Sequence, residues 1–225
     1  MKKIIFILLL FPLAISHSFS QSFEKGNKIF DVDFGLGIYN TTVKQNPGKT
    51  YPNPKDTTTK SKVASTLIAP SMEWAVGNRI SIGASLAYSH YLSNKDSVTG
   101  YKPTASGLDG NFFFNFHFVK SKRVDFFGGL KLGIGGFRLV LNDGTSNVYG
   151  SMGRASDLHF AARFYVSDRI GIIASLAFPR YKFKKFGNTL DDTYTLGFKG
   201  LYLGTGIAIK LGGSKTEQAP AAGGK

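Results

Sequence analysis

The sequence contains no cysteine. This absence excludes a disulfide framework, a thiolate zinc site, thiol catalysis and a lipoprotein anchor on an N-terminal cysteine. No apolar run reaches the roughly 20 residues that a membrane-spanning helix needs, since the longest extends only from Ile4 to Ile15. A protein built of several membrane helices is therefore excluded. Charged residues are also scarce, at 19% against about 25% in ordinary soluble domains.

Glycine and phenylalanine, in contrast, are abundant. The chain has 27 Gly and 20 Phe among its 225 residues, but only one Trp. The hydrophobic fraction of 42% excludes a disordered chain, which needs low hydrophobicity and high charge. Together with the scarce charge, this composition favours a β-protein with much apolar surface. The length suits one domain or one barrel.

The first 20 residues have the pattern of a secretory signal peptide. Lys2 and Lys3 precede the apolar residues 4–15. Small residues then follow, and they predict cleavage between Ser20 and Gln21, with a second possible site a few residues earlier. An uncleaved anchor helix is the alternative, which the short apolar run disfavours. Removing the two lysines lowers the formal net charge from +14 to +12, and the mature protein is predicted to be exported.

The mature chain alternates apolar and small or polar residues with a period of two. In the clearest run Phe112, Phe114 and Phe116 share one parity, while Asn111 and His117 belong to the other. This period is the signature of a β-strand, whose successive side chains point to opposite faces. The pattern occurs eight times, in residues 29–39, 64–76, 79–91, 111–118, 125–135, 158–166, 170–178 and 200–211. Most of these runs reach the length that a tilted strand needs to cross a bilayer.

The connections between the runs alternate between short and long. Short turns are predicted at 77–78, 120–123 and 167–168, and long polar loops at 40–62, 92–106, 138–156 and 180–193. Short periplasmic turns and long extracellular loops are typical of outer-membrane barrels. The sequence therefore predicts an all-β fold, an eight-stranded antiparallel up-and-down transmembrane β-barrel. Its boundaries are a signal peptide at 1–20, a short N-terminal periplasmic segment at 21–27, the barrel at 28–211 and a flexible periplasmic tail at 212–225.

A soluble, lipocalin-like barrel is the alternative reading of the same pattern. There the apolar parity would point inward around a ligand. The apolar parity carries no charge on any of the eight runs, and the other parity is rich in Gly, Ala and Ser. Four Phe from one strand would overpack so narrow a lumen, so the apolar parity is expected to face lipid. Pro70 is expected to cause a bulge or to shorten its strand.

Aromatic residues of the apolar parity lie near both predicted rims. Trp74 and Phe118 are close to short turns, and Tyr88 and Phe178 are close to long loops. Such positions are typical of interfacial aromatic girdles. The alternative is that any Phe-rich barrel scatters aromatics near its rims.

The signal segment, the eight runs, the rule of short turns and long loops and the glycine-rich run Gly200 to Gly206 together resemble a known superfamily. The chain is similar to small outer-membrane β-barrels, most of all to the OmpA-transmembrane-like and PorT-like group. The resemblance covers roughly Lys28 to Leu211 and implies an outer-membrane location. It carries over no functional residue. Two departures are the lack of a folded periplasmic domain after the barrel and the final strand end at Leu211, where many such barrels have an aromatic residue.

Charged residues of the inward parity are predicted to form ion pairs that fill the lumen. A buried charge is costly unless it is paired and hydrogen-bonded. Counting from the short turns places Glu73 and Arg163 at similar heights, with Lys131 higher. The predicted network consists of Asp31, Asp33, Glu73, Asp125, Lys131 and Arg163. A gated or leaky ion path is a second interpretation, and catalysis a third.

The residues near the long loops do not favour an enzyme of barrel type. Ser89 and His90 are consecutive in a strand, so they point to opposite faces and cannot form a catalytic pair. Asp191 and Asp192 lie in the last loop. The glycines at 133–136 are not a dinucleotide loop, because no helix follows them. No metal site and no cofactor is predicted.

Basic residues concentrate in the predicted loops. Lys182, Lys184 and Lys185 form the most compact cluster. Lipopolysaccharide phosphates are the expected counter-charge, with ordinary soluble loops as the alternative, and nucleic acid is not an expected partner. The sequence thus favours a non-enzymatic outer-membrane barrel, with a structural role or as a subunit of an envelope assembly. A small passive pore, or a barrel enzyme that acts on lipid or peptide, is the alternative.

Overall fold

The computed structural model describes residues 23–46, 57–92, 102–141, 147–186 and 193–212. The predicted signal peptide, its cleavage site and the predicted C-terminal tail therefore lie almost wholly outside the described residues. Across the described ranges, none of the chain forms a helix long and apolar enough to cross a membrane.

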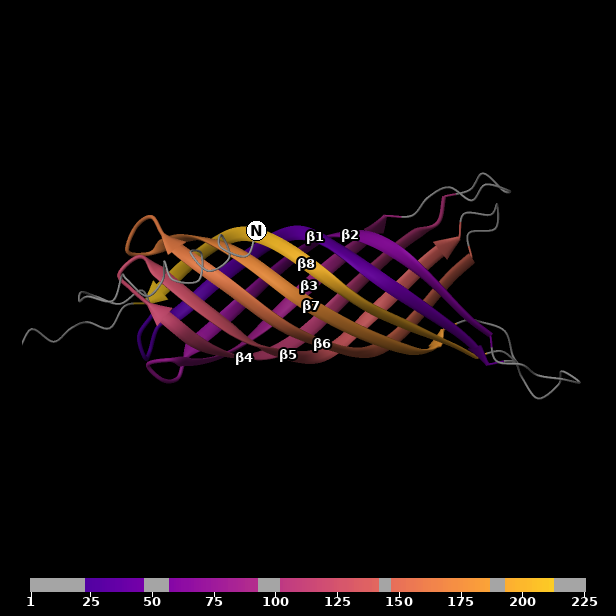
Figure 1. The fold of residues 1–225 in the computed structure, drawn as a ribbon, viewed down its shortest axis with the longest axis horizontal. Helices are drawn as coiled ribbons and strands as arrows, with labels where there is room; N and C mark the ends of the chain where they lie inside the picture. Colours follow the sequence, from indigo (N-terminus) through magenta and orange to yellow (C-terminus); the bar gives the residue numbers. More distant parts are fainter. Residues whose placement is uncertain (1–22, 47–56, 93–101, 142–146, 187–192, 213–225) are drawn as a thin grey trace, which may run out of the picture.

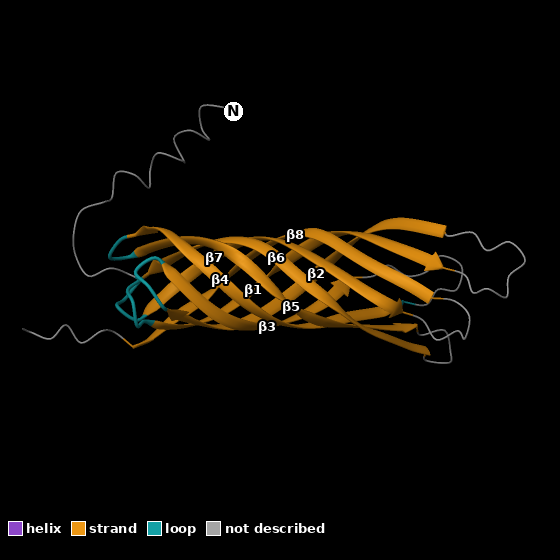
Figure 2. Cartoon of the chain, turned by 90° about the horizontal axis from the view of Figure 1, so that it is seen from below, coloured by secondary structure: helices purple, strands orange, loops and turns teal. Residues whose placement is uncertain are grey.

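Eight antiparallel strands close into a single barrel (Figures 1 and 2). Each strand pairs with its neighbours in sequence, and the barrel closes where the first strand pairs with the last, for example at Phe34 and Thr205. This up-and-down order confirms the predicted fold class. The strands are β1 (Lys28–Asn46), β2 (Thr57–Ala75), β3 (Ile80–Leu92), β4 (Thr104–Lys120), β5 (Val124–Leu141), β6 (Asn147–Tyr165), β7 (Ile170–Phe186) and β8 (Thr193–Gly212).

Three tight turns join strands at one end of the barrel, which we call the short-turn end. The turn between β2 and β3 closes with a hydrogen bond from the Gly77 N–H to the Ile80 carbonyl, at 3.0 Å. The turns that follow β4 and β6 close with the same kind of backbone hydrogen bond, from Ser121 to Val124 and from Ser167 to Ile170, and each adds a serine hydroxyl. There the Ser121 and Ser167 hydroxyls accept the N–H groups of residues three positions later, each at 3.0 Å. These positions match the turns predicted from the sequence.

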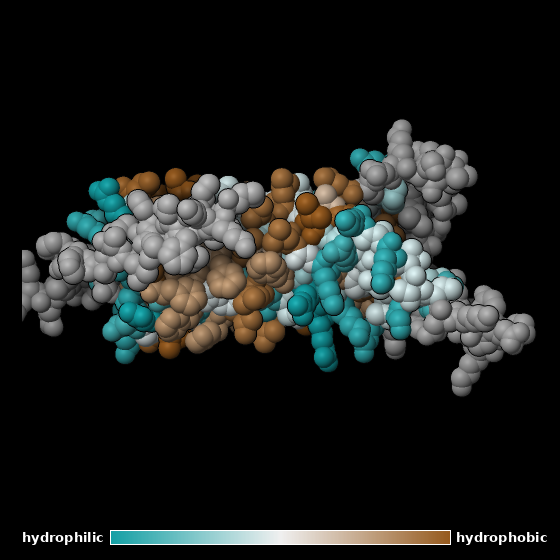
Figure 3. All heavy atoms as spheres, in the orientation of Figure 1, coloured by the Kyte–Doolittle hydropathy of each residue, from teal (hydrophilic) through white to brown (hydrophobic). Residues whose placement is uncertain are grey.

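In the half of the barrel nearest the short turns, apolar side chains point outward. Leu36, Leu132 and Ile134 are each more than 60% exposed, and Phe112 is 77% exposed. We call this surface the apolar band, and it is brown in Figure 3. The expected girdle aromatics also lie on the outer surface, with exposed fractions between 39% and 50% for Trp74, Phe118, Tyr88 and Phe178. The lumen receives the small and polar parity.

Pro70 has a different effect from the one expected. The register of β2 against β3 is the same on both sides of the proline, from Ile68↔Tyr88 to Ser71↔Ser85, and β2 continues past it. Both the expected bulge and the expected shortening are therefore wrong. Pairing with β1 is retained at Val32↔Pro70, while pairing with β3 is interrupted. The missing N–H of proline thus weakens one side of the strand only.

The strands are longer than predicted, because they enter the regions assigned to long loops. β1 runs to Asn46 rather than Tyr39, and β7 runs to Phe186 rather than Phe178. Beyond the apolar band the alternation persists, but its two faces exchange character. On β7, Arg180 and Lys182 are exposed, while Phe183 is buried. This part of the barrel has an apolar interior and a polar exterior, as a water-soluble barrel has.

Candidate functional site: a sealed lumen and an outer cation belt

A buried cluster of charges closes the lumen near the short-turn end. The Arg163 guanidinium contacts carboxylates from three other strands. Its Nη2 lies 2.5 Å from Asp31 Oδ2, its Nη1 lies 3.3 Å from Asp125 Oδ2, and its Nη2 also pairs with Glu73 Oε2. All four side chains are at most 5% exposed. Four of the six residues of the predicted network therefore meet.

His117 completes this arrangement, which we call the floor cluster (Arg163, Asp31, Glu73, Asp125 and His117). The imidazole Nδ1 lies 2.7 Å from Asp125 Oδ1, and Nε2 lies 3.1 Å from Glu73 Oε1. Because carboxylate oxygens only accept, both ring nitrogens donate, which is the pattern of a protonated histidine. The ring stacks on Phe23 at 3.5 Å between centroids and on Phe127 at 5.1 Å.

Phe23 seals the floor cluster from the short-turn end. Its side chain is fully buried and packs with Ile29, Ala75 and Ala208. A turn brings it there: the Gly26 N–H donates to the Ala75 carbonyl at 2.8 Å, and Gly26 has a φ of 90°, which favours glycine. The segment before β1 therefore fills the mouth of the barrel.

Ser81, His117 and Asp125 have the connectivity of a catalytic triad. The Ser81 Oγ lies 3.1 Å from His117 Nε2, on the opposite side of the ring from Asp125. However, the serine hydroxyl donates to Glu73, and the histidine has no free lone pair to act as a base. Ser81, His117 and Asp125 are all completely buried. The geometry fits a structural hydrogen-bond network.

The other two members of the predicted network, Asp33 and Lys131, lie higher in the lumen. Neither makes an ion pair within 4.0 Å in the described part of the chain. Lys131 Nζ instead lies 5.9 Å from the centre of the Phe113 ring. Its cross-strand neighbour Asp157 accepts the Phe178 N–H at 3.0 Å, so this carboxylate has another partner. The network is therefore split into two levels.

Aromatic rings close the lumen at the other end. We call this group the roof cluster, and it consists of Tyr39, Tyr91, Ala105, Phe137, Phe183, Leu196 and Phe198. Tyr91 and Phe198 stack at 5.1 Å, and Phe137 lies 5.4 Å from Phe198. Packed side chains of the floor cluster and the roof cluster thus lie below and above the middle of the lumen.

The outer surface above the apolar band is strongly basic. Its exposed cations, which we call the cation belt, are Lys44, Lys60, Lys62, Arg138, Arg154, Arg180, Lys182, Lys184 and Lys199. Every described Asp or Glu at this height faces the lumen instead. Figure 3 shows teal side chains beside the brown band on this side of the molecule. Five belt residues also line an outer groove of about 500 Å³.

Several belt cations stand directly opposite one another on neighbouring strands. Arg154 pairs in register with Lys182, and Arg180 pairs with Lys199. Like charges in such positions repel and are destabilising unless an anion lies between them. Two of the three predicted basic residues, Lys182 and Lys184, belong to this belt on β7 rather than to a loop, and the Lys185 side chain lies outside the described residues.

Some of these residues were missed when the sequence was interpreted. His117 was noted but given no partner, and Phe23 was assigned to a plain periplasmic segment. The belt and the roof were missed because the loops were assigned wherever the apolar parity ended. A continued alternation with exchanged faces, as in Arg180-Tyr181-Lys182-Phe183, is the signal that could have found both. No similar signal in the sequence reveals that Phe23 folds back into the lumen.

The structure describes Ser89 and His90, two of the residues considered for an enzyme. Ser89 is buried in the lumen wall, while His90 points to the outer side of β3, as predicted from their parity. Asp191 and Asp192 lie outside the described residues. Within the described ranges, no group of three or more His, Cys, Asp or Glu side chains could hold a metal ion.

Comparisons with known proteins agree with the observed fold. No protein-family model matches the chain, and no curated protein gives a significant match. Among solved structures, the outer membrane protein OprG from Pseudomonas aeruginosa is 9% identical, with a TM-score of 0.54 over 86% of this chain and 100% of OprG. The attachment invasion locus protein Ail of Yersinia pestis is 14% identical, with a TM-score of 0.42 over 82% and 99%. The outer membrane protease OmpT from Escherichia coli is 11% identical, with a TM-score of 0.43 over 86% and 99%. The chain therefore has the fold of the small outer-membrane β-barrels.

Proposed function

We propose that this protein is an integral outer-membrane barrel with a non-enzymatic, structural role, in which the cation belt holds the phosphates of outer-leaflet lipopolysaccharide. The observation that carries the proposal is the facing of like charges, Arg154 with Lys182 and Arg180 with Lys199, with no described acid on that surface. Shared anions remove this repulsion, and guanidinium groups bind phosphate through two parallel hydrogen bonds.

The height of the belt supports lipid phosphate as the anion. On β7 the last outward apolar residue is Phe178, and the next outward position is Arg180. On β8 the same step leads from Leu201 to Lys199. Phosphates that flank the hydrocarbon boundary of the outer leaflet would lie at this level, beside the belt. In this orientation the short-turn end faces the periplasm.

The packing of side chains at both ends of the lumen supports a structural role over a pore or an enzyme. The floor cluster and Phe23 fill the periplasmic mouth, and the roof cluster fills the other end. The one serine that contacts a histidine there is completely buried and donates to Glu73. A passive pore would need a continuous path, and a hydrolase would need an accessible nucleophile.

Charge reversal in the belt tests this proposal. The double variant Arg180→Glu/Lys182→Glu is purified from outer membranes in mild detergent, and the lipopolysaccharide phosphate bound per barrel is measured at low and high salt. We expect several-fold less bound phosphate than in the wild type, and wild-type retention that falls with salt, because exposed charge contacts are screened.

The matched control is Lys122→Glu/Arg123→Glu, which makes the same change of charge at the opposite rim. It should retain lipopolysaccharide as the wild type does. Equal retention by both double variants would contradict the proposal. Recovery of a stable protein partner with the wild-type barrel, lost on reversal of the belt, would favour an envelope-assembly subunit instead.

A further inference from the structure

The outer groove within the cation belt, which we call the belt hollow, lies on the wall formed by β6, β7, β8 and β1. Gly197 is part of its floor, between Lys182 of β7 and Thr42 of β1 in the register. A Cβ atom on Gly197 would lie 3.8 Å from its nearest contact, so this position has room for added atoms. The volume of about 500 Å³ falls within the usual range of ligand sites, about 300–1,000 Å³.

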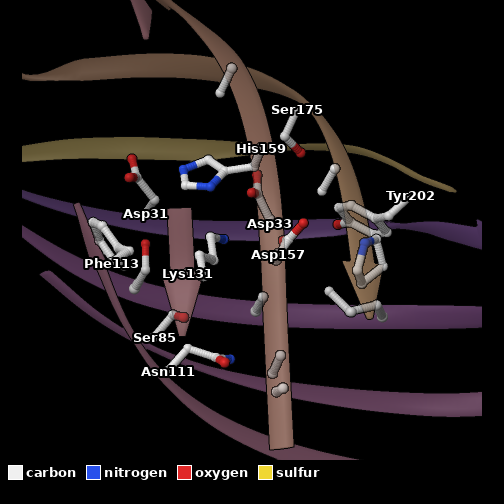
Figure 4. Close-up of a pocket in the computed structure, with 18 of the residues that line it drawn as sticks. Asp31, Asp33, Ser85, Asn111, Phe113, Lys131, Asp157, His159, Ser175 and Tyr202 are labelled. Carbon is white, nitrogen blue, oxygen red and sulfur yellow. The ribbon is translucent and has the colours of Figure 1, made fainter. Parts of the chain in front are cut away.

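Five long cationic side chains surround the belt hollow. They are Lys44, Arg154, Arg180, Lys182 and Lys199. A phosphate monoester carries only about −1.5 to −2 charges at pH 7, so one phosphate would leave most of this positive charge unbalanced. The described acid nearest to the hollow in the sequence is Asp157, which points into the lumen, as do Lys131 and His159 (Figure 4). The belt hollow therefore suits a ligand with more than one anionic group.

Four of these cations form two facing pairs at different heights. Arg154 faces Lys182 across β6 and β7. Arg180 faces Lys199 across β7 and β8. The second pair is displaced by two residues along the strands, about 6.7 Å, and by one strand sideways, about 4.8 Å, so the backbone centres of the two pairs are about 8 Å apart. A single phosphate is too small to lie at both centres, whereas two phosphates on one sugar head are not.

Neutral polar side chains complete the floor of the belt hollow. Thr42, Ser156 and Thr195 are half-buried there, and Asn40 follows Lys199 in the register. Hydroxyl and amide groups both donate and accept hydrogen bonds, as the hydroxyl groups of a sugar do. The hollow thus combines two cation pairs for phosphates with a small, neutral floor for a saccharide.

We propose that the belt hollow binds the doubly phosphorylated sugar head of one lipopolysaccharide molecule, with one phosphate at each facing pair and the sugar over Gly197. This inference rests on the proposed function, and it adds a place, a stoichiometry and a ligand class. Elsewhere in the belt, Lys60 faces Thr42 and Arg138 faces Gly150, so each of these cations stands beside a neutral residue. A lone exposed cation makes a weaker contact with phosphate than a facing pair does.

The test measures binding of two probes to the purified, full-length mature barrel in mild detergent at constant ionic strength. The probes are diphosphoryl and monophosphoryl lipid A, which differ by one phosphate on the same sugar. Isothermal titration calorimetry gives the stoichiometry and the dissociation constants. We expect one diphosphoryl molecule per barrel, bound about tenfold more tightly than the monophosphoryl form, because the second phosphate adds charge-assisted hydrogen bonds at the second pair.

Two double variants with the same change of charge locate the site. Arg154→Ala/Lys182→Ala removes one facing pair and should abolish the difference between the probes. Arg138→Ala/Lys60→Ala removes the same residue types from the belt outside the hollow and should keep the difference. An equal loss in both double variants would overturn this inference but leave the proposed function intact, since the belt would then hold lipopolysaccharide without a discrete site. Failure of the wild type to bind either probe would contradict both.

A change without charge tests the hollow itself. Gly197→Leu fills the floor and should weaken the binding of both probes severalfold. The matched control is Gly150→Leu on the outer face of β6, where a Cβ atom would also lie 3.8 Å from its nearest contact. This control lies outside the hollow and should bind as the wild type does. Wild-type binding by Gly197→Leu would overturn the placement of the sugar.

Discussion

The two halves of this barrel share the same strands but bury opposite kinds of side chain. In the half with the short turns, apolar side chains such as Leu36 and Leu132 point outward, and charges such as Arg163 are buried. In the half with the long loops, Arg180 and Lys182 point outward, and Phe183 and Phe198 are buried. The exchange occurs within single strands, and on β7 it coincides with a short interruption of the pairing with β8, from Ala177↔Tyr202 to Arg180↔Lys199, across which the register is unchanged. The comparison teaches that the environment around each half, rather than strand geometry, decides which parity is apolar.

The largest expected effect comes from emptying the centre of the floor cluster. Arg163→Ala leaves Asp31, Glu73 and Asp125 buried without their cation, and this should lower the free energy of unfolding by about 3–5 kcal/mol. Urea unfolding of the refolded barrel, followed by tyrosine and tryptophan fluorescence, measures the loss.

Arg154→Ala is the matched control, since it removes the same residue type from the outer face of the same strand. It should change the stability by about 0.5 kcal/mol or less. If the two alanine variants were equally stable, the buried Arg163 would contribute no more to the free energy of unfolding than the exposed Arg154. The contrast between the two halves of the barrel would then not extend to stability.

A smaller and more local effect is expected in the roof cluster. Phe183→Ala removes a side chain that is 1% exposed, and burial of this kind contributes about 3 kcal/mol. Because the strand ends above the apolar band can open without unfolding the rest, the loss should show as faster trypsin cleavage at Lys182 and Lys184. Limited proteolysis with mass spectrometry measures it.

Phe112→Ala serves as the comparison, because it removes the same ring from the outer surface of the apolar band. Cleavage of the upper strand ends should then proceed at the wild-type rate. Faster cleavage in both variants would mean that the two halves do not open independently.

A third effect should depend on height alone. Leu132 and Met152 are exposed to nearly the same extent, at 63% and 65%, but Met152 lies closer to the cation belt. In a bilayer, Leu132→Arg should cost about 2–4 kcal/mol and Met152→Arg about 0–1 kcal/mol, because the cost of a charge falls toward the interface. Refolding equilibria in lipid vesicles give both values. A reversed order would place the hydrocarbon layer elsewhere on the barrel.

The sequence contained enough information to predict the strand order and the turns, but not the length of the strands. Eight runs of period two defined the apolar band, and the parity count placed Glu73 level with Arg163. The roof was missed because Arg180 to Lys184 was interpreted as a polar loop, although its alternation continues with the faces exchanged. The same count placed Lys131 higher than Arg163, but it could not predict the contacts of the upper level. Lys131 and Asp157 are cross-strand neighbours, yet an aromatic ring and a backbone N–H are their actual partners.

The extension of β7 past the apolar band determines how far its end lies from the lipid surface. From Phe178 to Phe186, β7 rises eight residues, which at about 3.3 Å per residue and a tilt of about 40° corresponds to a height of about 20 Å. The end of β7 at Phe186 therefore lies well away from the lipid surface, and a short epitope tag inserted after it would start at this height. An antibody that reaches a tag inserted there needs no access to the headgroups themselves.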